Sequence, residues 1–193
     1  MTWAPAAHKR FYDASELRQA GLTYYRVRKL IEQGTLVKHG NKVYENTGFQ
    51  GNETDFSIVS SFVPKGVFCM MSAARFYGLT TYLPDSVDIA IERSMKISTY
   101  PEWPAINVWY FSEERFTAGV TTASDEAGSF QIYDMEKTVV DILHYRTKVG
   151  IEETKDVLKN YLFRNDRNLT KLHRYADQLG CGKILSTYLE VLL

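Results

Sequence analysis

The stretch GLTYYRVRKLIEQG, from Gly21 to Gly34, predicts a short amphipathic helix with a signal at each end. Thr23 suits the N-cap, and Gly34 readily adopts the left-handed conformation that follows a last helical turn. The apolar residues recur at spacings of three and four and form one narrow stripe: Val27, Leu30 and Ile31. The opposite face is basic and aromatic, which suits insertion into a DNA groove. A solvated surface helix is the alternative.

The segment before this helix predicts a second, shorter helix. Asp13 and Glu16 have the spacing of a capping box, and the helix runs through Leu17 and Arg18 to a stop at Gly21. Only a Gly-Leu turn separates the two helices. Two helices joined so closely, the second of them basic, form a helix-turn-helix pattern.

The segment after the basic helix predicts a β-hairpin. Apolar residues of TLVKHGNKVYEN lie on both sides of Gly40 and Asn41, a pair that suits a tight turn with positive φ. A two-residue turn places Val37 opposite Tyr44 and leaves basic side chains at the tip. Helix, turn, basic helix and basic-tipped hairpin follow one another in the order of a winged helix-turn-helix.

The charge distribution places any contact with a polyanion in the N-terminal segment. Residues 1–50 carry eight Lys and Arg against four Asp and Glu, a net charge of +4, whereas the remainder carries 15 basic and 19 acidic residues, a net charge of −4. A winged helix used only for protein contacts is the alternative. The predicted DNA-binding residues come from the basic helix and the hairpin: Thr23, Tyr24, Tyr25, Arg26, Arg28, Lys29, Lys38, His39, Asn41 and Lys42.

The rest of the chain predicts a separate domain. TGFQGNETD, from Thr47 to Asp55, has no periodicity and indicates a linker, so we place a DNA-binding domain at residues 1–50 and a C-terminal domain at residues 51–193. Periodicity predicts helices over residues 56–62 and 67–78, strands over residues 87–92, 106–111 and 130–133, and four helices from residue 134 onward. The expected fold class is α+β: an N-terminal winged helix-turn-helix followed by a C-terminal domain with a small β-sheet and several helices.

No motif predicts catalysis, a metal site or a cofactor, and the sequence indicates that the protein is not an enzyme. A phosphate-binding loop, GxSxG and HExxH are all absent, and the four histidines are scattered. A metal-dependent nuclease is the one enzyme worth testing, because Asp88 and Glu92 lie on a predicted strand. Such a site needs an acid followed two residues later by a lysine, but Glu92 is followed by Arg93 and Ser94. An acidic outer face of the strand explains Asp88 and Glu92 equally well.

A polar cluster surrounds the start of the helix predicted after Asp134. Its acids lie near the helix start and a basic residue lies near its end, as the helix macrodipole favours. Structural capping explains most of the cluster. The functional alternative is a surface that contacts a partner, formed by Glu136, Lys137, Asp141 and Arg146.

The sequence indicates a cytoplasmic protein without membrane contact. Its N-terminus lacks a signal-peptide pattern, and no window approaches the ~18 apolar residues of a membrane helix. Cys69 and Cys181 lie far apart without metal-ligand spacing, so reduced thiols are expected.

Four stretches resemble the AbiEi family of antitoxins, winged-helix transcriptional regulators of phage-defence loci in type IV (abortive infection) toxin–antitoxin systems. DASELRQAGLTYYRVRKLIEQGTLVKHGNKVY resembles the family's winged helix, and SAARFYGLT, SVDIAIER and YDMEKTVVDILHYRTKVG resemble its C-terminal domain. The likeness covers most of the chain in the family's order, and the last stretch is the most specific. The chain departs from the family at Lys42, where the hairpin of the family often has a second glycine.

The resemblance implies a bifunctional protein. The N-terminal domain would bind inverted repeats in the double-stranded DNA of its own promoter and repress its operon. The C-terminal domain would counteract a cognate nucleotidyltransferase toxin without forming a stable complex with it. The protein would be a monomer in solution, or two copies would meet on the DNA. The alternative is a stand-alone winged-helix transcriptional regulator whose C-terminal domain senses a ligand or another protein.

Overall fold

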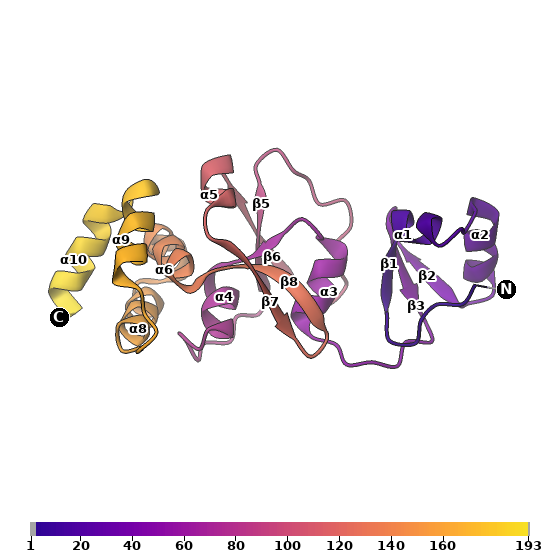
Figure 1. The fold of residues 1–193 in the computed structure, drawn as a ribbon, viewed down its shortest axis with the longest axis horizontal. Coiled ribbons are helices and arrows are strands. Elements are labelled where there is room, and N and C mark those ends of the chain that lie inside the picture. Colours follow the sequence, from indigo (N-terminus) through magenta and orange to yellow (C-terminus); the bar gives the residue numbers. More distant parts are fainter. Residues whose placement is uncertain (1–2, 193) are drawn as a thin grey trace. The chain divides into compact units, whose positions relative to one another are not determined.

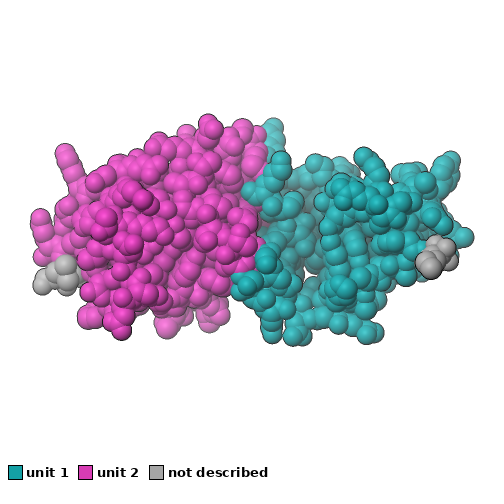
Figure 2. Space-filling view, in the orientation of Figure 1, with its two compact units in different colours: residues 1–65, 96–104, 124–129 teal, residues 66–95, 105–123, 130–193 magenta. Residues whose placement is uncertain are grey.

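The computed structural model describes residues 3–192, which form two compact units (Figure 2). Unit 1 holds the chain up to Lys65 together with residues 96–104 and 124–129, and unit 2 holds the rest. The predicted boundary after residue 50 falls inside unit 1. Helices and strands both contribute, so the α+β class is confirmed. Within residues 3–192, no helix has the length and apolar character needed to cross a membrane.

The sheet of unit 1 has three antiparallel strands in the order β1-β3-β2 (Figure 1). β1 spans Phe11–Asp13, β2 spans Leu36–His39 and β3 spans Val43–Asn46. β2 and β3 form the predicted hairpin, whereas β1 is too short to give a strand pattern in the sequence. The central strand β3 places Tyr44 between Tyr12 of β1 and a residue of β2.

Two helices lie between β1 and β2, as the capping signals predict. α1 spans Ala14–Gln19 and α2 spans Tyr24–Glu32. The N–H of Glu16 donates to the carboxylate of Asp13 at 2.8 Å, and the N–H of Asp13 donates to the carboxylate of Glu16 at 2.9 Å. This capping box satisfies donors that a helix start otherwise leaves open. Gly21 then turns the chain with a φ of +78°.

A small core joins these helices to the sheet. Leu17 of α1, Leu22 of the turn and Leu36 of β2 are buried, and the apolar stripe of α2 packs against them while remaining half-exposed. Burying one leucine contributes about 1.5–3 kcal/mol, so the three together supply roughly 5–9 kcal/mol before chain entropy is counted.

Helix α3 (Asp55–Phe62) follows the predicted linker and belongs to unit 1. Thr54 is its N-cap, and its hydroxyl donates to the carboxylate of Asp125 at 2.6 Å. The ring of Phe62 packs edge-on against Phe11 of β1, with 5.2 Å between the ring centroids. The segment after β3 therefore leads into a helix that packs on β1.

The second sheet has five strands in the order β6-β5-β4-β8-β7. Figure 1 labels β5, β6, β7 and β8 of this sheet. β5 runs parallel to β6 and antiparallel to β4, and β4 runs parallel to β8. The strands are β4 (Val67–Phe68), β5 (Val87–Glu92), β6 (Ile106–Phe111), β7 (Val120–Asp125) and β8 (Gly128–Tyr133). The predicted strands are confirmed as β5, β6 and the second half of β8.

The predicted helix over residues 67–78 is wrong at its start. The chain first forms β4, and α4 begins at Met70. The run from Val67 is apolar at almost every position, and such a run does not distinguish a buried strand from a buried helix. The sequence pattern does not predict β7, because the largely polar and exposed residues of this strand show no apolar alternation.

The helices of unit 2 surround α6 (Met135–His144), which contacts α4, α8, α9 and α10. Every residue from Met135 to Leu143 is buried, so α6 is the interior helix of this unit. The other helices are α4 (Met70–Phe76), α5 (Glu113–Thr117), α7 (Arg146–Val149), α8 (Ile151–Leu162), α9 (Leu169–Gln178) and α10 (Gly182–Leu192).

Both cysteines are free thiols in the interior of unit 2. Cys69 precedes α4 and Cys181 precedes α10, and both side chains are buried. Burial raises the pKa of Cys69 well above its ordinary value and raises the pKa of Cys181 to about 11. Both thiols are therefore protonated at neutral pH and unreactive in the folded protein.

Candidate nucleic-acid interface

Helix α2 presents a face of aromatic and basic side chains to solvent. Thr23 caps it by accepting a hydrogen bond from the N–H of Arg26 at 3.4 Å, and Gly34 follows its last turn with a φ of +72°. The rings of Tyr24 and Tyr25 are 77% and 82% exposed. Neighbouring exposed aromatic side chains are typical of a surface that binds a partner.

Nine of the ten predicted DNA-contacting residues are exposed. They are Thr23, Tyr24, Tyr25, Arg26, Arg28, Lys29, Lys38, Asn41 and Lys42. Nε of Arg28 lies 3.0 Å from a carboxylate oxygen of Glu32 in an exposed pair. Such pairs contribute about 0–1 kcal/mol, so Arg28 can exchange this partner for a phosphate at little cost.

The hairpin differs from the prediction in its register. Lys38 pairs with Tyr44, whereas a two-residue turn would pair Val37 with Tyr44. Its loop holds three residues, 40–42, because β2 ends at His39. A shift of one residue exchanges the faces of a strand. Lys38 therefore shares a face with Tyr44, and His39 lies on the opposite face.

His39 is the one predicted DNA-contacting residue that is not exposed in the observed register of the hairpin. Its ring is half-buried, and its Nε2 lies 2.6 Å from Oε2 of Glu45. The ring also makes edge contacts with Phe11 of β1 and Phe62 of α3. These contacts tie His39 and the hairpin to β1 and α3, and a DNA contact of His39 stays a prediction.

Glu45 is the centre of a charged cluster in unit 1. It accepts from His39 and from Arg10, whose Nη2 lies 2.6 Å away, and Arg10 also pairs with Glu53. Partial burial raises the pKa of Glu45, but the hydrogen bonds from His39 and Arg10 outweigh burial and leave the pKa below its ordinary value.

We expect Glu45 to make the stability of unit 1 dependent on pH. Because its folded-state pKa is lowered, its carboxylate contributes stability above the unfolded-state value of 4.5, and this contribution is lost as the pH falls through the folded pKa. Glu45→Gln should therefore lower the urea midpoint at pH 7, and by less at about pH 3. Glu32→Gln, which breaks only the exposed pair with Arg28, is the matched control. Equal losses from Glu45→Gln at both pH values would contradict this role.

A groove opens between α1, α2 and the β2–β3 hairpin, all within unit 1. It has a volume of about 280 Å³ and is lined by Ala14, Leu17, Arg18, Leu22, Tyr24, Val27, Arg28, Ile31, Lys38 and Tyr44. Arg18 is absent from the predicted site, although it brings a third cation to this groove. Its place in the last turn of α1, directly before the basic helix, is the signal that could have found it.

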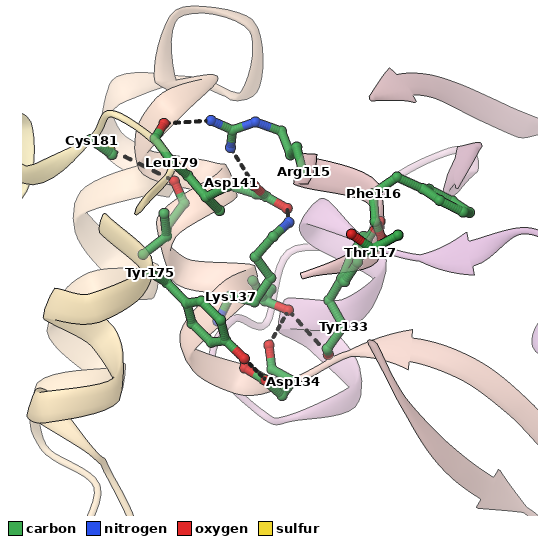
Figure 3. A network of polar contacts seen from close by, with 12 residues as sticks. Arg115, Phe116, Thr117, Tyr133, Asp134, Lys137, Asp141, Tyr175, Leu179 and Cys181 are labelled. Carbon is green, nitrogen blue, oxygen red and sulfur yellow. Dashed lines mark hydrogen bonds and ion pairs between the residues drawn. The ribbon is translucent and has the colours of Figure 1, made fainter. Parts of the chain in front are cut away.

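The second predicted site is not a surface. Lys137 and Asp141 are fully buried, and Glu136 is only 4% exposed. Nζ of Lys137 pairs with one carboxylate oxygen of Asp141, and Nη1 of Arg115 donates to the other at 2.6 Å (Figure 3). The predicted partner surface is therefore corrected to an interior ion network. Neighbouring helices pack around α6 and cover these side chains.

The triad Arg115–Lys137–Asp141 joins three elements of unit 2. Nη2 of Arg115 on α5 donates to the carbonyl of Leu179, at the end of α9, at 2.8 Å. Nζ of Lys137 lies 4.0 Å from the ring centroid of Tyr133, a cation–π contact. Burial lowers the pKa of Lys137, although the charge of Asp141 opposes this effect.

Two further acids hold α9 against the start of α6. The hydroxyl of Tyr175 donates to Oδ2 of Asp134 at 2.8 Å, and Nζ of Lys171 lies 3.2 Å from both Asp134 and Glu136. Of the four residues of the predicted partner surface, only Arg146 is partly exposed. These contacts give the polar cluster a structural role, because they hold neighbouring elements of unit 2 together.

Asp88 of β5 is a buried carboxylate that connects elements of unit 2. It accepts hydrogen bonds from the N–H of Met71 at 3.1 Å and from the side chains of Asn107 and Trp109 at 2.8 Å each. Burial raises its pKa, while the three hydrogen bonds act in the opposite direction. Its oxygens are thus used in joining α4 to β6. Within residues 3–192, no group of three or more His, Cys, Asp and Glu side chains is arranged to hold a metal ion.

Comparison with known proteins identifies no family for this chain. No family model and no curated protein matches it. Among solved structures, the RV2827C protein from Mycobacterium tuberculosis is similar to it with 14% sequence identity and a TM-score of 0.49. The similarity covers 95% of this chain and 76% of the mycobacterial one. Likeness at this level assigns no function.

Proposed function

We propose that the N-terminal segment, residues 1–50, forms a winged helix-turn-helix that binds double-stranded DNA and represses transcription. The exposed face of α2 carries this proposal. Its stripe of Val27 and Ile31 turns toward the core, while its aromatic and basic side chains turn to solvent. A helix fits the B-DNA major groove, about 12 Å wide, and the short turn from α1 to α2 suits this mode of docking.

In the proposed complex α2 lies in the major groove and the hairpin loop follows the adjacent backbone. Arg26 and Arg28 can contact guanine edges or phosphates bidentately, because the guanidinium presents paired donors. Lys38 and Lys42 neutralise phosphates beside the groove, where contacts fix the register of the protein without reading sequence. Two copies on inverted repeats would place two α2 helices in major-groove segments about one helical turn, or a multiple of it, apart.

For unit 2 we propose antitoxin activity against a nucleotidyltransferase toxin encoded with this protein, exerted without a stable complex. The support is the resemblance of SAARFYGLT, SVDIAIER and YDMEKTVVDILHYRTKVG to the C-terminal domain of AbiEi antitoxins. Together with the DNA-binding segment, this describes a repressor that controls its own operon. The second candidate function is a stand-alone winged-helix regulator whose C-terminal domain senses a ligand or another protein. The groove beside α2 lies in unit 1 and would instead place a ligand in the DNA-binding segment of such a regulator.

We expect the two activities to separate by mutation of the full-length chain. Arg26→Ala with Arg28→Ala should release a reporter gene fused to the promoter and still rescue cells that express the toxin, because both arginines lie on α2, outside unit 2. Growth and reporter output in the same cells provide the measurement.

The matched control for this experiment is Arg75→Ala with Arg174→Ala, which removes two exposed arginines from helices of unit 2. This variant should keep repression intact. Loss of rescue by the folded α2 variant would overturn the proposed division of activities. Retained repression by that variant would overturn the assignment of α2 to DNA.

A further inference from the structure

The groove between α1, α2 and the hairpin is large enough for a small ligand. Its volume of about 280 Å³ lies just below the ~300–1,000 Å³ range of ligand pockets. Two helices form one side and the hairpin forms the other, so one ligand would touch several elements of unit 1.

The base of this groove is apolar. Leu17 and Leu22 are buried at its base, and Val27 and Ile31 of α2 are half-exposed. None of the residues of α2 is fully buried, although its apolar stripe packs on the core. The stripe is therefore incompletely covered, and the apolar part of a ligand can complete its burial.

Three cations line the same groove from three different elements. They are Arg18 of α1, Arg28 of α2 and Lys38 of β2. In the part of the chain that the structure describes, Arg28 is the one of the three that pairs with a carboxylate, that of Glu32, and this pair is exposed. Converging positive charges without an enclosed anion complement a negatively charged ligand group.

From this combination we infer that the groove binds a small amphipathic anion, an aromatic or aliphatic group bearing a carboxylate, sulfonate or phosphate. The apolar base disfavours a free inorganic anion, and the three cations disfavour a neutral hydrocarbon. Tyr24, Arg28 and Lys38 belong both to this groove and to the predicted DNA face. A bound anion therefore competes with DNA. This competition rests on the proposed function, whereas binding of the anion to the groove is independent of that function.

The site can be tested on the full chain with 1-anilinonaphthalene-8-sulfonate, an aromatic anion, and with N-phenyl-1-naphthylamine, its uncharged relative. Fluorescence titration gives both affinities. Arg18→Gln should weaken binding of the sulfonate about tenfold and that of the amine less than about twofold, because one charge-assisted contact is lost. Val27→Phe, which fills the groove, should weaken binding of both probes at least about tenfold, and circular dichroism verifies folding. Arg26→Gln removes a cation of α2 that does not line the groove, and it should leave both affinities unchanged.

Sulfonate affinity that is unchanged in both Arg18→Gln and Val27→Phe would overturn the site. Competition is then measured by the anisotropy of a labelled promoter duplex. The sulfonate should raise the apparent Kd of the parent protein for DNA. The Arg18→Gln variant should need about tenfold more sulfonate than the parent protein for the same rise in Kd. Absence of competition in a protein that binds both would overturn the regulatory link. Absence of DNA binding would instead overturn the proposed function. The fluorescence titration would still decide whether the groove binds the anion.

Discussion

Replacing both Arg26 and Arg28 by alanine is expected to weaken promoter binding by roughly 100-fold or more. Loss of one arginine contact to a base costs about 1–3 kcal/mol, and loss of one phosphate contact lowers the salt dependence of binding by about one unit of slope. Both side chains are exposed on α2, so their removal leaves the core of unit 1 unchanged. The variant should therefore fold normally and bind DNA weakly.

Gel-shift titration of the promoter fragment at two salt concentrations measures both effects. Arg75→Ala with Arg174→Ala is the control, because it removes the same charge from exposed helical positions of unit 2. An equal loss of affinity in the control would mean that net charge alone determines binding. Unchanged binding by the α2 variant would exclude α2 as the recognition helix.

The second large effect is expected at Asp141. Asp141→Asn keeps the shape of the side chain but leaves the buried cations Lys137 and Arg115 without their anion. Removing one partner from a buried ion pair costs about 3–5 kcal/mol, since the remaining charge stays desolvated. Unit 2 should lose this much stability, measurable as faster hydrogen exchange of the α6 amides under native conditions.

Lys137→Met provides the matched contrast. It leaves Arg115 and Asp141 as a balanced pair and replaces the amine by an apolar side chain of similar length. Burial lowers the pKa of Lys137, and Arg115 still pairs with Asp141 after the substitution, so Lys137→Met should cost less stability than Asp141→Asn. A loss from Lys137→Met equal to that from Asp141→Asn would refute the view that Asp141 is the essential charge of the triad.

The local signals of the sequence predict the helices of unit 1 well. The capping box at Asp13, the N-cap at Thr23 and the glycines after the helices define α1 and α2 to within a residue or two. The pattern around β5 and β6 is equally local, because alternation and apolar runs reflect burial of the strand itself. Helices and strands whose formation is determined by their own residues can therefore be predicted from the sequence.

The register of the hairpin and the place of His39 depend on more than local signals. Gly40 and Asn41 suit a two-residue turn, yet the chain uses three loop residues. Contacts of His39 with Glu45 and Phe62 accompany the observed register, and Phe62 is distant in sequence. The inward position of the His39 ring therefore depends on Phe62, which lies outside the hairpin, and cannot be predicted from the hairpin sequence alone.

The polar cluster of α6 misleads for a similar reason. Its apolar residues suggest one buried face, which leaves Lys137 and Asp141 for solvent. The helices α8, α9 and α10 also contact α6 and leave it no solvent face between Met135 and Leu143. Burial is then possible because Arg115 and Lys137 satisfy Asp141, a pairing across 26 residues of sequence in the case of Arg115.

The side chains of α6 from Met135 to Leu143 are buried, so they cannot contact a partner of the folded protein. Residues 135–143 form half of YDMEKTVVDILHYRTKVG, the stretch with the most specific resemblance to AbiEi antitoxins. Likeness in this stretch can reflect a shared interior, and it cannot by itself encode the choice of a partner. Under the proposed antitoxin function, a preference for one toxin over another would have to be encoded in outward-facing side chains, such as those of α8, α9 and α10. Exchange of these surfaces between related proteins, with α6 retained, would transfer that preference without rebuilding the core.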